Sequence, residues 1–541
     1  IIGGGHNGLV AATYLARAGK SVRILEENPE IGGATQSVRT FPQFDANLSR
    51  YSYLIALLPD KIVNDLGLSF ECISREVSSY TPYGDNKGLY VSRLWDEQTA
   101  RSFNELDPTG HEGQAWQDFY AEVAQFAERI APTLLEPLKT RSELKKQIDL
   151  DPIWQYLVED PIGKVITERF SNDVVRGVVL TDALIGTFAS AFDLQANICF
   201  LYHLMGNGTG EWKVPKGGMG ALVKELLRVA TDSGVEISLN SKATRVISTD
   251  DGVEVSTESG EVVKGEYLLS NAAPAVLATL RGTTPPKSLD GSQMKINILL
   301  KRLPQLKSGI DPRLAFAGTF HANETFSQFE SVFADAQAGV MPAKMPIEMY
   351  CHTLSDPSIL SEELQDAGYQ TLTLFGLHTP ASLFDADNDA ARDAALKSAL
   401  ASLNEYLAEP IEDVIAAIEV KTPLDIEEAI SLPRGNIFHR DLDFPFIDSS
   451  GANLIWGSET SDKHIYLAGA GARRGGFREL AARHAGTGRT LAGVRALQGG
   501  HPLLLPRFRA RSARPPRALF RREDQRPARQ HQRSRAGGGR V

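Results

Sequence analysis

Three glycines near the start of the chain have the spacing of a loop that binds a dinucleotide. In IIGGGHNGLVAATYLARAGKSVRILEENPEIGGA, Gly3, Gly5 and Gly8 spell G-x-G-x-x-G. The first glycine permits a tight turn, the second lets backbone approach a pyrophosphate, and the third packs a helix against a strand. Glu26 follows at the usual distance of about 20 residues, where a carboxylate accepts hydrogen bonds from a ribose. These residues predict a site for a pyrophosphate and its ribose.

Such a loop needs a strand before it and a helix after it. Ile1 and Ile2 are predicted to end a buried strand, and Ser21 to Leu25 to form a second strand that ends at Glu26. Apolar residues at helical spacing lie between them: Ala11, Ala12, Leu15 and Ala16. The glycines therefore lie in a complete strand, loop, helix and strand unit, which strengthens the dinucleotide prediction.

A second glycine pair bears on which dinucleotide is bound, because the first motif serves nicotinamide and flavin cofactors alike. Gly32 and Gly33 follow Glu26 closely and offer another place where backbone can approach the ligand. This arrangement resembles the FAD-binding N-terminus of the amine oxidase and carotenoid desaturase superfamily. A dehydrogenase that binds only a nicotinamide cofactor is an alternative, and the second glycine pair argues against it.

Composition excludes several other classes of protein. The 541 residues carry a net charge of −10, although the stretch from His501 to Val541 holds twelve Arg against one Asp and one Glu. The body of the chain is therefore acidic and lacks the excess of basic residues that is typical of nucleic-acid-binding proteins. Its three cysteines form no CxxC pair, which argues against a redox disulfide and a zinc ribbon. We predict no metal site.

The remaining elements indicate a second domain. The predicted helices cover Trp116 to Ile130, Ala221 to Ala230 and Asp389 to Leu407, and the predicted strands cover Met294 to Leu300, Ile347 to Cys351 and Thr371 to Leu377. Short strands separated by turn residues follow the second of these helices. From His464, the stretch HIYLAGAGARRGG is predicted to be a buried strand that enters another glycine loop.

Several blocks of sequence resemble one flavoprotein family. They are the opening unit, PKGGMGALVKEL with SNAAP, RGNIFH with IYLAGAGARRGG, and the phrases VVLTDALIGTFAS and YHLMGNGTGEW. Together they resemble the phytoene desaturase type of FAD-dependent oxidoreductase, closest to the branch called pyridine nucleotide-disulfide oxidoreductase domain-containing protein 2. The resemblance covers nearly the whole chain up to Gly476. Because no CxxC is present, the disulfide part of that name does not apply here.

The resemblance implies a mixed α/β fold: a Rossmann-like FAD-binding domain of the amine oxidase and phytoene desaturase type, with an inserted substrate domain of antiparallel sheet plus helices. We expect the FAD-binding domain to comprise residues 1–60, 213–290 and 455–498, and the substrate domain 61–212 and 291–454. Residues 499–541 form an Arg/Pro-rich tail, which we expect to be disordered. The family pattern stops at Gly476, and we interpret this as a slip of the coding frame. A basic arm that binds an anionic membrane or nucleic acid is the alternative.

The resemblance also assigns roles to particular residues. Gly3, Gly5 and Gly8 would hold the pyrophosphate, Glu26 the ribose, Gly32 and Gly33 the second close approach, Val246 the adenine through its backbone, and Gly469 and Gly471 the flavin ring and phosphates. Many relatives carry Arg directly after the paired glycines, where this chain has Ala34. Arg39 and Arg50 are candidate substitutes for that guanidinium.

The chemistry implied is removal of a hydride from a small hydrophobic substrate, lipid-like or isoprenoid, for which a nearby acid or base would move the proton. The catalytic residue is unknown. The candidates, chosen because each lies next to a cofactor block in the sequence, are His203, Glu211, Lys216 and His439.

A binding or regulatory protein is the alternative to an enzyme, because a similar fold also serves proteins that bind a lipid or prenylated partner without redox turnover. We expect a cytoplasmic protein that touches a membrane peripherally. Since the chain begins inside its first strand, a mitochondrial matrix location is the alternative. Its oligomeric state is not predicted.

Overall fold

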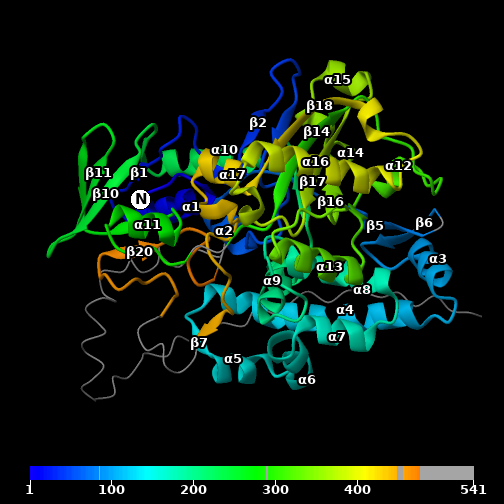
Figure 1. Cartoon of the computed structure of the whole chain (residues 1–541). Coiled ribbons are helices and arrows are strands. Elements are labelled where there is room, and N and C mark those ends of the chain that lie inside the picture. The colour runs from blue at the N-terminus through cyan, green and yellow to red at the C-terminus, as the bar shows by residue number, and fades with distance from the viewer. Residues whose placement is uncertain (85, 288–289, 448–454, 475–541) are drawn as a thin grey trace, which may run out of the picture. The chain divides into compact units, whose positions relative to one another are not determined.

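A computed structural model describes the whole chain apart from residues 85, 288–289, 448–454 and 475–541 (Figure 1). A parallel sheet is built around its first residues, because Ile2 bridges Leu25 on one side and Ser270 on the other. Beyond these contacts, β1 (Arg23–Leu25) pairs with β9 (Glu236–Ser238), and β13 (Leu268–Ser270) pairs with β20 (Ile465–Leu467). The resulting order is β9, β1, Ile2, β13 and β20.

Two apolar cores cover this sheet. α1 (His6–Arg17) and α10 (Met219–Asp232) share one core with sheet residues. The three-stranded meander of β10 (Ala243–Ser248), β11 (Val253–Thr257) and β12 (Val262–Gly265) shares the other core with Ile2 and Ile465. The arrangement is the Rossmann-like unit that the glycine motif predicts.

A second, larger sheet has seven strands in the order β18, β14, β17, β16, β15, β5 and β6. All neighbours are antiparallel except β15 and β5. Its strands are β5 (Val77–Tyr83), β6 (Lys87–Ser92), β14 (Met294–Leu300), β15 (Thr319–Ala322), β16 (Ile347–Tyr350), β17 (Gln370–Gly376) and β18 (Ile415–Lys421). Successive side chains of a strand point to opposite faces. On one face, Ile296 and Leu374 share an apolar core with α16 (Asn388–Asn404).

A layer of helices encloses the largest apolar core of the described residues, and it lies in the lower part of Figure 1. Its main helices are α4 (His111–Ile130), α7 (Ile162–Arg169), α8 (Asp173–Leu184) and α9 (Leu194–Leu204). The predicted apolar stripe of α4, Phe119, Val123, Phe126 and Ile130, is buried in this core.

The shorter strands and helices connect these parts. The strands are β2 (Ser37–Arg39), β3 (Asn47–Ser49), β4 (Cys72–Ser74), β7 (Lys139–Thr140), β8 (Lys213–Pro215) and β19 (Phe446–Ile447). The helices are α2 (Asp60–Leu66), α3 (Glu97–Leu106), α5 (Arg141–Ile148), α6 (Asp151–Trp154), α11 (Pro274–Leu280), α12 (Pro312–Ala315), α13 (Phe326–Gln337), α14 (His352–Ser355), α15 (Glu362–Asp366) and α17 (Pro423–Ile430).

The elements agree closely with the sequence pattern, and their ends differ for local reasons. The strand predicted over Met294–Leu300 has those bounds. The helix predicted from Trp116 begins earlier, at His111, because Gly110 adopts a positive φ of 79° and the Asp107 carboxylate accepts a hydrogen bond from the Glu112 N–H. A polar first turn carries no apolar periodicity, so the pattern could not locate this start.

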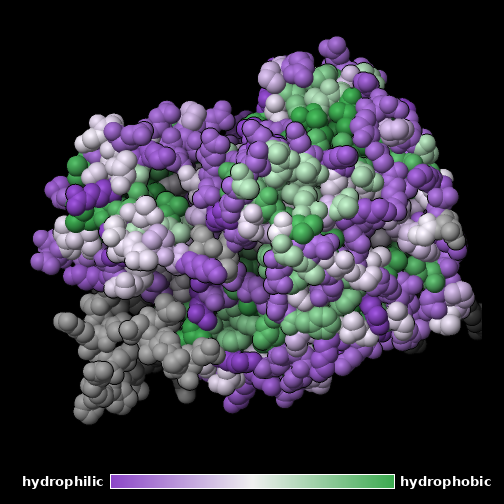
Figure 2. All heavy atoms as spheres, viewed as in Figure 1, coloured by the Kyte–Doolittle hydropathy of each residue, from purple (hydrophilic) through white to green (hydrophobic). Residues whose placement is uncertain are grey.

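Among the described residues, no helix combines the length and apolar character needed to cross a bilayer. The face drawn in Figure 2 is mainly hydrophilic, with several separate apolar areas. The interpretation of the stretch after Gly476 as a frame slip concerns residues outside the described part of the chain.

Candidate functional site

The first glycine loop leads directly into α1. At Gly8, an added Cβ would lie 2.4 Å from the carbonyl oxygen of Gly3 and 3.1 Å from Nδ2 of Asn271, so no side chain fits there. The helix has no side-chain cap at its start and no acidic residue in its first turn. Its first N–H groups can therefore serve an anion, as a pyrophosphate cradle requires.

The second glycine pair lies against this loop. Gly5 and Gly32 form a parallel bridge, and the Gly32 N–H donates to the Gly4 carbonyl at 3.0 Å. Gly33 has a φ of +56°, and a Cβ on it would lie 3.4 Å from the Gly5 Cα. The structure thus brings together the two glycine clusters that the sequence singled out.

Glu26 is buried at the end of β1. Its Oε2 accepts from the Gly4 N–H at 2.7 Å, and its Oε1 accepts from the backbone and side chain of Asn28 at 3.0 and 3.1 Å. The Glu26 carbonyl also accepts from the N–H of Ser241, just before β10. Val246 is buried in β10, which is an edge strand of its meander. The segment of Glu26 therefore contacts the segment that leads into β10. The ribose role of Glu26 and the adenine role of Val246 stay predictions.

The last glycine loop closes on the same region. A Cβ on Gly469 would lie 2.4 Å from the carbonyl oxygen of Asn271. On Gly471 it would lie 2.3 Å from Cδ of Pro274 and 3.3 Å from Cβ of His439. The SNAAP, RGNIFH and LAGAG blocks therefore meet in space, although they are far apart in the sequence.

Neither candidate substitute for the missing guanidinium is free to serve a phosphate. Arg39 donates to the Phe44 carbonyl on an exposed hairpin, and Arg50 is ion-paired with Glu419 of the seven-stranded sheet.

The four acid–base candidates lie in different surroundings. Lys216 is exposed and pairs with Glu71 at 3.0 Å, whereas Glu211 lies between Arg93 and Lys213 at 3.8 and 3.6 Å. These are ion-pair positions near the surface.

His203 is buried, whereas His439 is only partly buried. His203 stacks on Trp212, and its Nδ1 lies 2.8 Å from the Asp182 carbonyl. Burial lowers the pKa of His203 to about 4, so it is neutral at physiological pH. His439 adjoins Gly471. The four side chains form no common cluster.

A row of side chains that the sequence pattern does not single out crosses the second face of the seven-stranded sheet. Directly paired positions on neighbouring strands run Lys421, Lys295, Phe375, Glu348 and His321. Such partners point to the same face. We call these five residues the polar row. They come from five separate strands, so the sequence pattern of any one strand does not reveal the row.

Glu348 is the acidic centre of the polar row. It is fully buried, and its two carboxyl oxygens accept from the hydroxyls of Tyr53 and Tyr350 at 3.2 and 3.1 Å. Burial and the nearby Glu324 charge raise the pKa of Glu348 to about 8. Glu348 therefore carries its proton at neutral pH, which is unusual for a carboxyl group.

Lys295 is the buried base of the polar row. Its Nζ donates to the Tyr51 carbonyl at 3.0 Å and lies 4.7 Å from the ring centre of Tyr53 and 4.2 Å from that of Phe375. Burial lowers the pKa of Lys295 well below its ordinary value. An amine in this environment can exist in its neutral, proton-accepting form.

Backbone contacts connect the polar row to the glycine loops. Lys295 binds the carbonyl of Tyr51, and the next residue, Ser52, donates its N–H to the Ala34 carbonyl at 3.0 Å. Ala34 directly follows Gly33. The polar row therefore lies beside the region where the glycine loops would place a dinucleotide.

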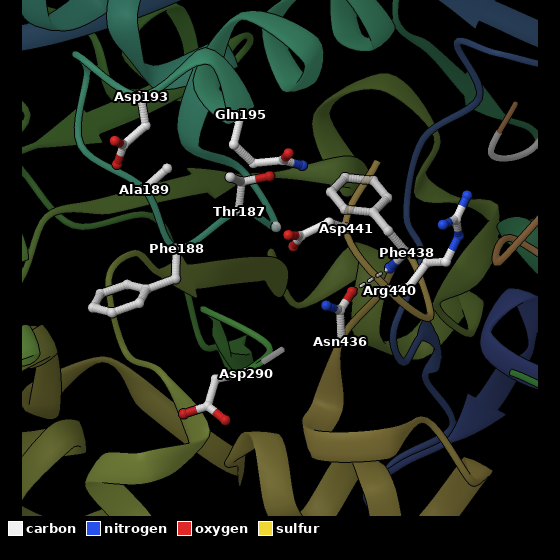
Figure 3. A pocket seen from close by; sticks show the side chains of 11 residues that line it. Thr187, Phe188, Ala189, Asp193, Gln195, Asp290, Asn436, Phe438, Arg440 and Asp441 are labelled. Carbon is white, nitrogen blue, oxygen red and sulfur yellow. Dashed lines mark hydrogen bonds between the residues drawn. The ribbon is translucent and has the colours of Figure 1, made fainter. Parts of the chain in front are cut away.

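A pocket of about 310 Å³ opens between the loop after α8 and the RGNIFH segment. Figure 3 shows Thr187, Gln195 and Asp441 projecting into it. Phe188 and Phe438 contribute aromatic walls, and the Phe438 ring lies 6.4 Å from that of His203. The complete lining is Gly186, Thr187, Phe188, Ala189, Asp193, Gln195, Asp290, Asn436, Phe438, Arg440 and Asp441.

Comparison with known protein families agrees with this geometry. Residues 1–57 match an NAD(P)-binding Rossmann-like domain, and residues 88–297 match the flavin-containing amine oxidoreductases.

Curated relatives decide the family. An uncharacterized protein of Mycobacterium tuberculosis is 42% identical to this chain, and the match covers 88% of this chain and 93% of the relative. The mouse pyridine nucleotide-disulfide oxidoreductase domain-containing protein 2 is 28% identical over 88% of this chain and 90% of its own. The chain belongs to the phytoene desaturase-like FAD-dependent oxidoreductases. A 4,4'-diaponeurosporene oxygenase of Staphylococcus aureus is 24% identical over 50% of this chain and 54% of its own.

Solved structures show the same fold. A variant of putrescine oxidase covers 92% of this chain and 98% of its own, with a TM-score of 0.54 and 16% identity. The predicted mixed α/β fold is confirmed, and so is the prediction that the chain is an FAD-dependent oxidoreductase.

The residues of the glycine loops fit FAD. Gly5, Gly32 and Gly33 carry no side chains of their own where the two loops meet, and the start of α1 offers its N–H groups to the pyrophosphate.

Proposed function

We propose that this oxidoreductase removes a hydride from a hydrophobic, lipid-like or isoprenoid substrate, in chemistry like that of the phytoene desaturases. The observation that carries the proposal is the continuous path from Gly33 through Ala34, Ser52 and Tyr51 to Lys295. It places buried acid–base groups beside the cofactor loops, where a substrate must lie to exchange hydrogen with a flavin.

The parts of the site have separate tasks in this proposal. FAD, when bound, supplies the hydride acceptor. Gly3, Gly5 and Gly8 leave space for its pyrophosphate, and Glu26 accepts hydrogen bonds from its ribose.

The polar row would manage the proton that leaves with the hydride. A neutral Lys295 amine can take up a proton, and the protonated Glu348 carboxyl can hold or release one near pH 8. The Tyr53 and Tyr350 hydroxyls fix the orientation of that carboxyl group.

Apolar residues beside the pocket support a hydrophobic substrate. Phe188 and Phe438 line the pocket, and Phe192, Leu194 and Ile437 flank lining residues with exposed side chains. An exposed apolar rim of this kind suits a peripheral membrane contact, through which such a substrate would be collected. The relative from Staphylococcus aureus is itself named as an oxygenase of 4,4'-diaponeurosporene.

The first test concerns cofactor binding. Purified protein should show a flavin absorption spectrum that bleaches on anaerobic reduction, with FAD released on denaturation. In Gly8→Ala, where the new Cβ meets the Gly3 carbonyl at 2.4 Å, we expect bound FAD to fall below about a tenth of the wild-type content.

Gly113→Ala is the matched control, because Gly113 also lies in the first turns of a helix but its Cβ would meet nothing closer than 3.4 Å. This variant should keep its flavin. Equal FAD content in both variants would contradict the assignment of the loop, and a wild-type protein that takes up no FAD would contradict the proposed function.

A further inference from the structure

Beside the polar row lies a guanidinium that has no counter-ion among the described residues. Arg75 follows β4, and its guanidinium carbon lies 5.4 Å from the ring centre of Tyr350. Its Nε and Nη1 atoms are closed off from solvent, and neither finds a hydrogen-bond partner in the described part of the chain. A charged group in this state costs stability unless something binds it.

A second unpaired group lies nearby. His352 is buried and stacks on Tyr53 at 5.8 Å and on Tyr350 at 6.4 Å between ring centres. Within the described residues its Nε2 has no partner. Burial is the main cause that lowers the pKa of His352 to about 3, and the side chains of Lys295 and Arg75 lie close enough to this ring to lower it further.

No acidic group nearby forms an ion pair with Arg75 in the described part of the chain. Glu348 is hydrogen-bonded to Tyr53 and Tyr350, while Glu324 is paired with His321. Asp182 of α8 is the remaining acid, and among the described residues it makes no ion pair with Arg75. The nearby Glu348 and Asp182 carboxyl groups act on the Arg75 charge only from a distance.

We propose that Arg75 binds a carboxylate group of the substrate, which makes the substrate a hydrophobic acid. This inference rests on the proposed function, because it places the substrate on the polar face of the sheet. A planar guanidinium matches a carboxylate through two parallel hydrogen bonds. The Tyr350 ring lies against its face, and the neutral imidazole of His352 offers a further donor. The apolar remainder of the substrate would extend toward the helical layer.

The test is binding of matched amphiphiles to the FAD-loaded full-length protein, measured by calorimetry. Decanoate and decan-1-ol share an apolar chain and differ in the anionic group. Because charge-assisted hydrogen bonds to a guanidinium are at stake, we expect decanoate to bind about 10- to 100-fold more weakly to Arg75→Met than to wild type. Decan-1-ol should bind wild type and Arg75→Met with equal affinity. The affinity of Arg75→Lys for decanoate should lie between those of wild type and Arg75→Met.

Thermal unfolding without ligand separates a binding role from a structural one. Removing an unpaired buried charge relieves a penalty, so the Tm of Arg75→Met should equal or exceed that of wild type. Arg93→Met is the matched control, because Arg93 donates to the Arg75 carbonyl but is itself ion-paired to Glu211. This control should bind decanoate as wild type does.

Several outcomes would overturn the inference while leaving the proposed function intact. They are wild-type affinity of Arg75→Met for decanoate, an equal loss of affinity for decan-1-ol, or a Tm lowered by several degrees. A shift of the flavin midpoint potential with unchanged decanoate binding would also overturn it. Flavin content is measured first, because a protein that binds no FAD would contradict the proposed function and would not test the role of Arg75.

Discussion

Two rows of side chains run across the seven-stranded sheet on opposite faces, one residue apart on each of the five strands that they share. The apolar row runs Val420, Ile296, Leu374, Met349, Phe320 and Tyr80, and the polar row runs Lys421, Lys295, Phe375, Glu348 and His321. From Lys295 to His321 the polar row is almost as deeply buried as the apolar one. The rows therefore differ in chemistry and hardly in exposure.

This difference separates stability from function within one sheet. Burying apolar side chains is favourable, whereas burying charges costs free energy unless they are well paired. A protein that keeps a buried lysine and a buried acid on one face gives up stability there. Perturbed titratable groups of this kind gather at functional sites, and this face adjoins the cofactor loops.

The largest expected effect comes from breaking the apolar row. Phe320 is fully buried and stacks on Phe316 with ring centres 4.5 Å apart. Phe320→Ala should lower the free energy of unfolding by about 3–5 kcal/mol, because it loses apolar contact and leaves a cavity. Urea denaturation would measure this. A loss below about 1 kcal/mol would show that the apolar row does not stabilise the sheet.

An intermediate effect, visible against pH, is expected from the centre of the polar row. The pKa of Glu348 is raised from 4.5 to about 8, so between these values the folded state binds a proton that the unfolded state has lost. Its stabilising contribution is complete below pH 4.5 and is lost as pH rises toward 8, with a slope of at most about 1.4 kcal/mol per pH unit. Glu348→Gln should remove this slope.

Tm values measured from pH 5 to 9 would test the prediction for Glu348. Glu258→Gln, which changes an exposed glutamate in the turn between β11 and β12, should keep the wild-type profile. A wild-type slope in Glu348→Gln would mean that another group titrates.

The smallest expected effect concerns Lys295, and its pH dependence has the opposite sign. Because burial lowers the pKa of Lys295, the unfolded state binds the extra proton, and wild-type stability should rise as pH approaches 10.5. Lys295→Met should remove that rise and change the stability at pH 7 by less than about 1.5 kcal/mol. Unfolding scans from pH 6 to 10 would show it. A variant that unfolds many degrees lower at pH 7 would make Lys295 a structural residue.

Much of the fold was predictable from local pattern. The strand at Met294–Leu300 and the stripe of α4 follow from hydrophobic spacing, and Gly3, Gly5 and Gly8 follow from a motif whose physical requirements are local. The acid–base candidates were less accessible. His203, Glu211, Lys216 and His439 were chosen by distance along the chain, which says little about distance in space.

The sequence by itself determined the cofactor loops of this protein, because a tight turn, a helix start and a following acid all lie within one short segment. Only the tertiary structure decided that Lys295, Glu348 and His321 share one row. It also decided that Arg75 faces Tyr350 with no counter-ion in the part of the chain that the structure describes. A strand fixes which side chains alternate, but only its pairing register fixes which residues of distant strands meet. For that reason the cofactor loops can be read along the chain, whereas the polar row exists only across the sheet.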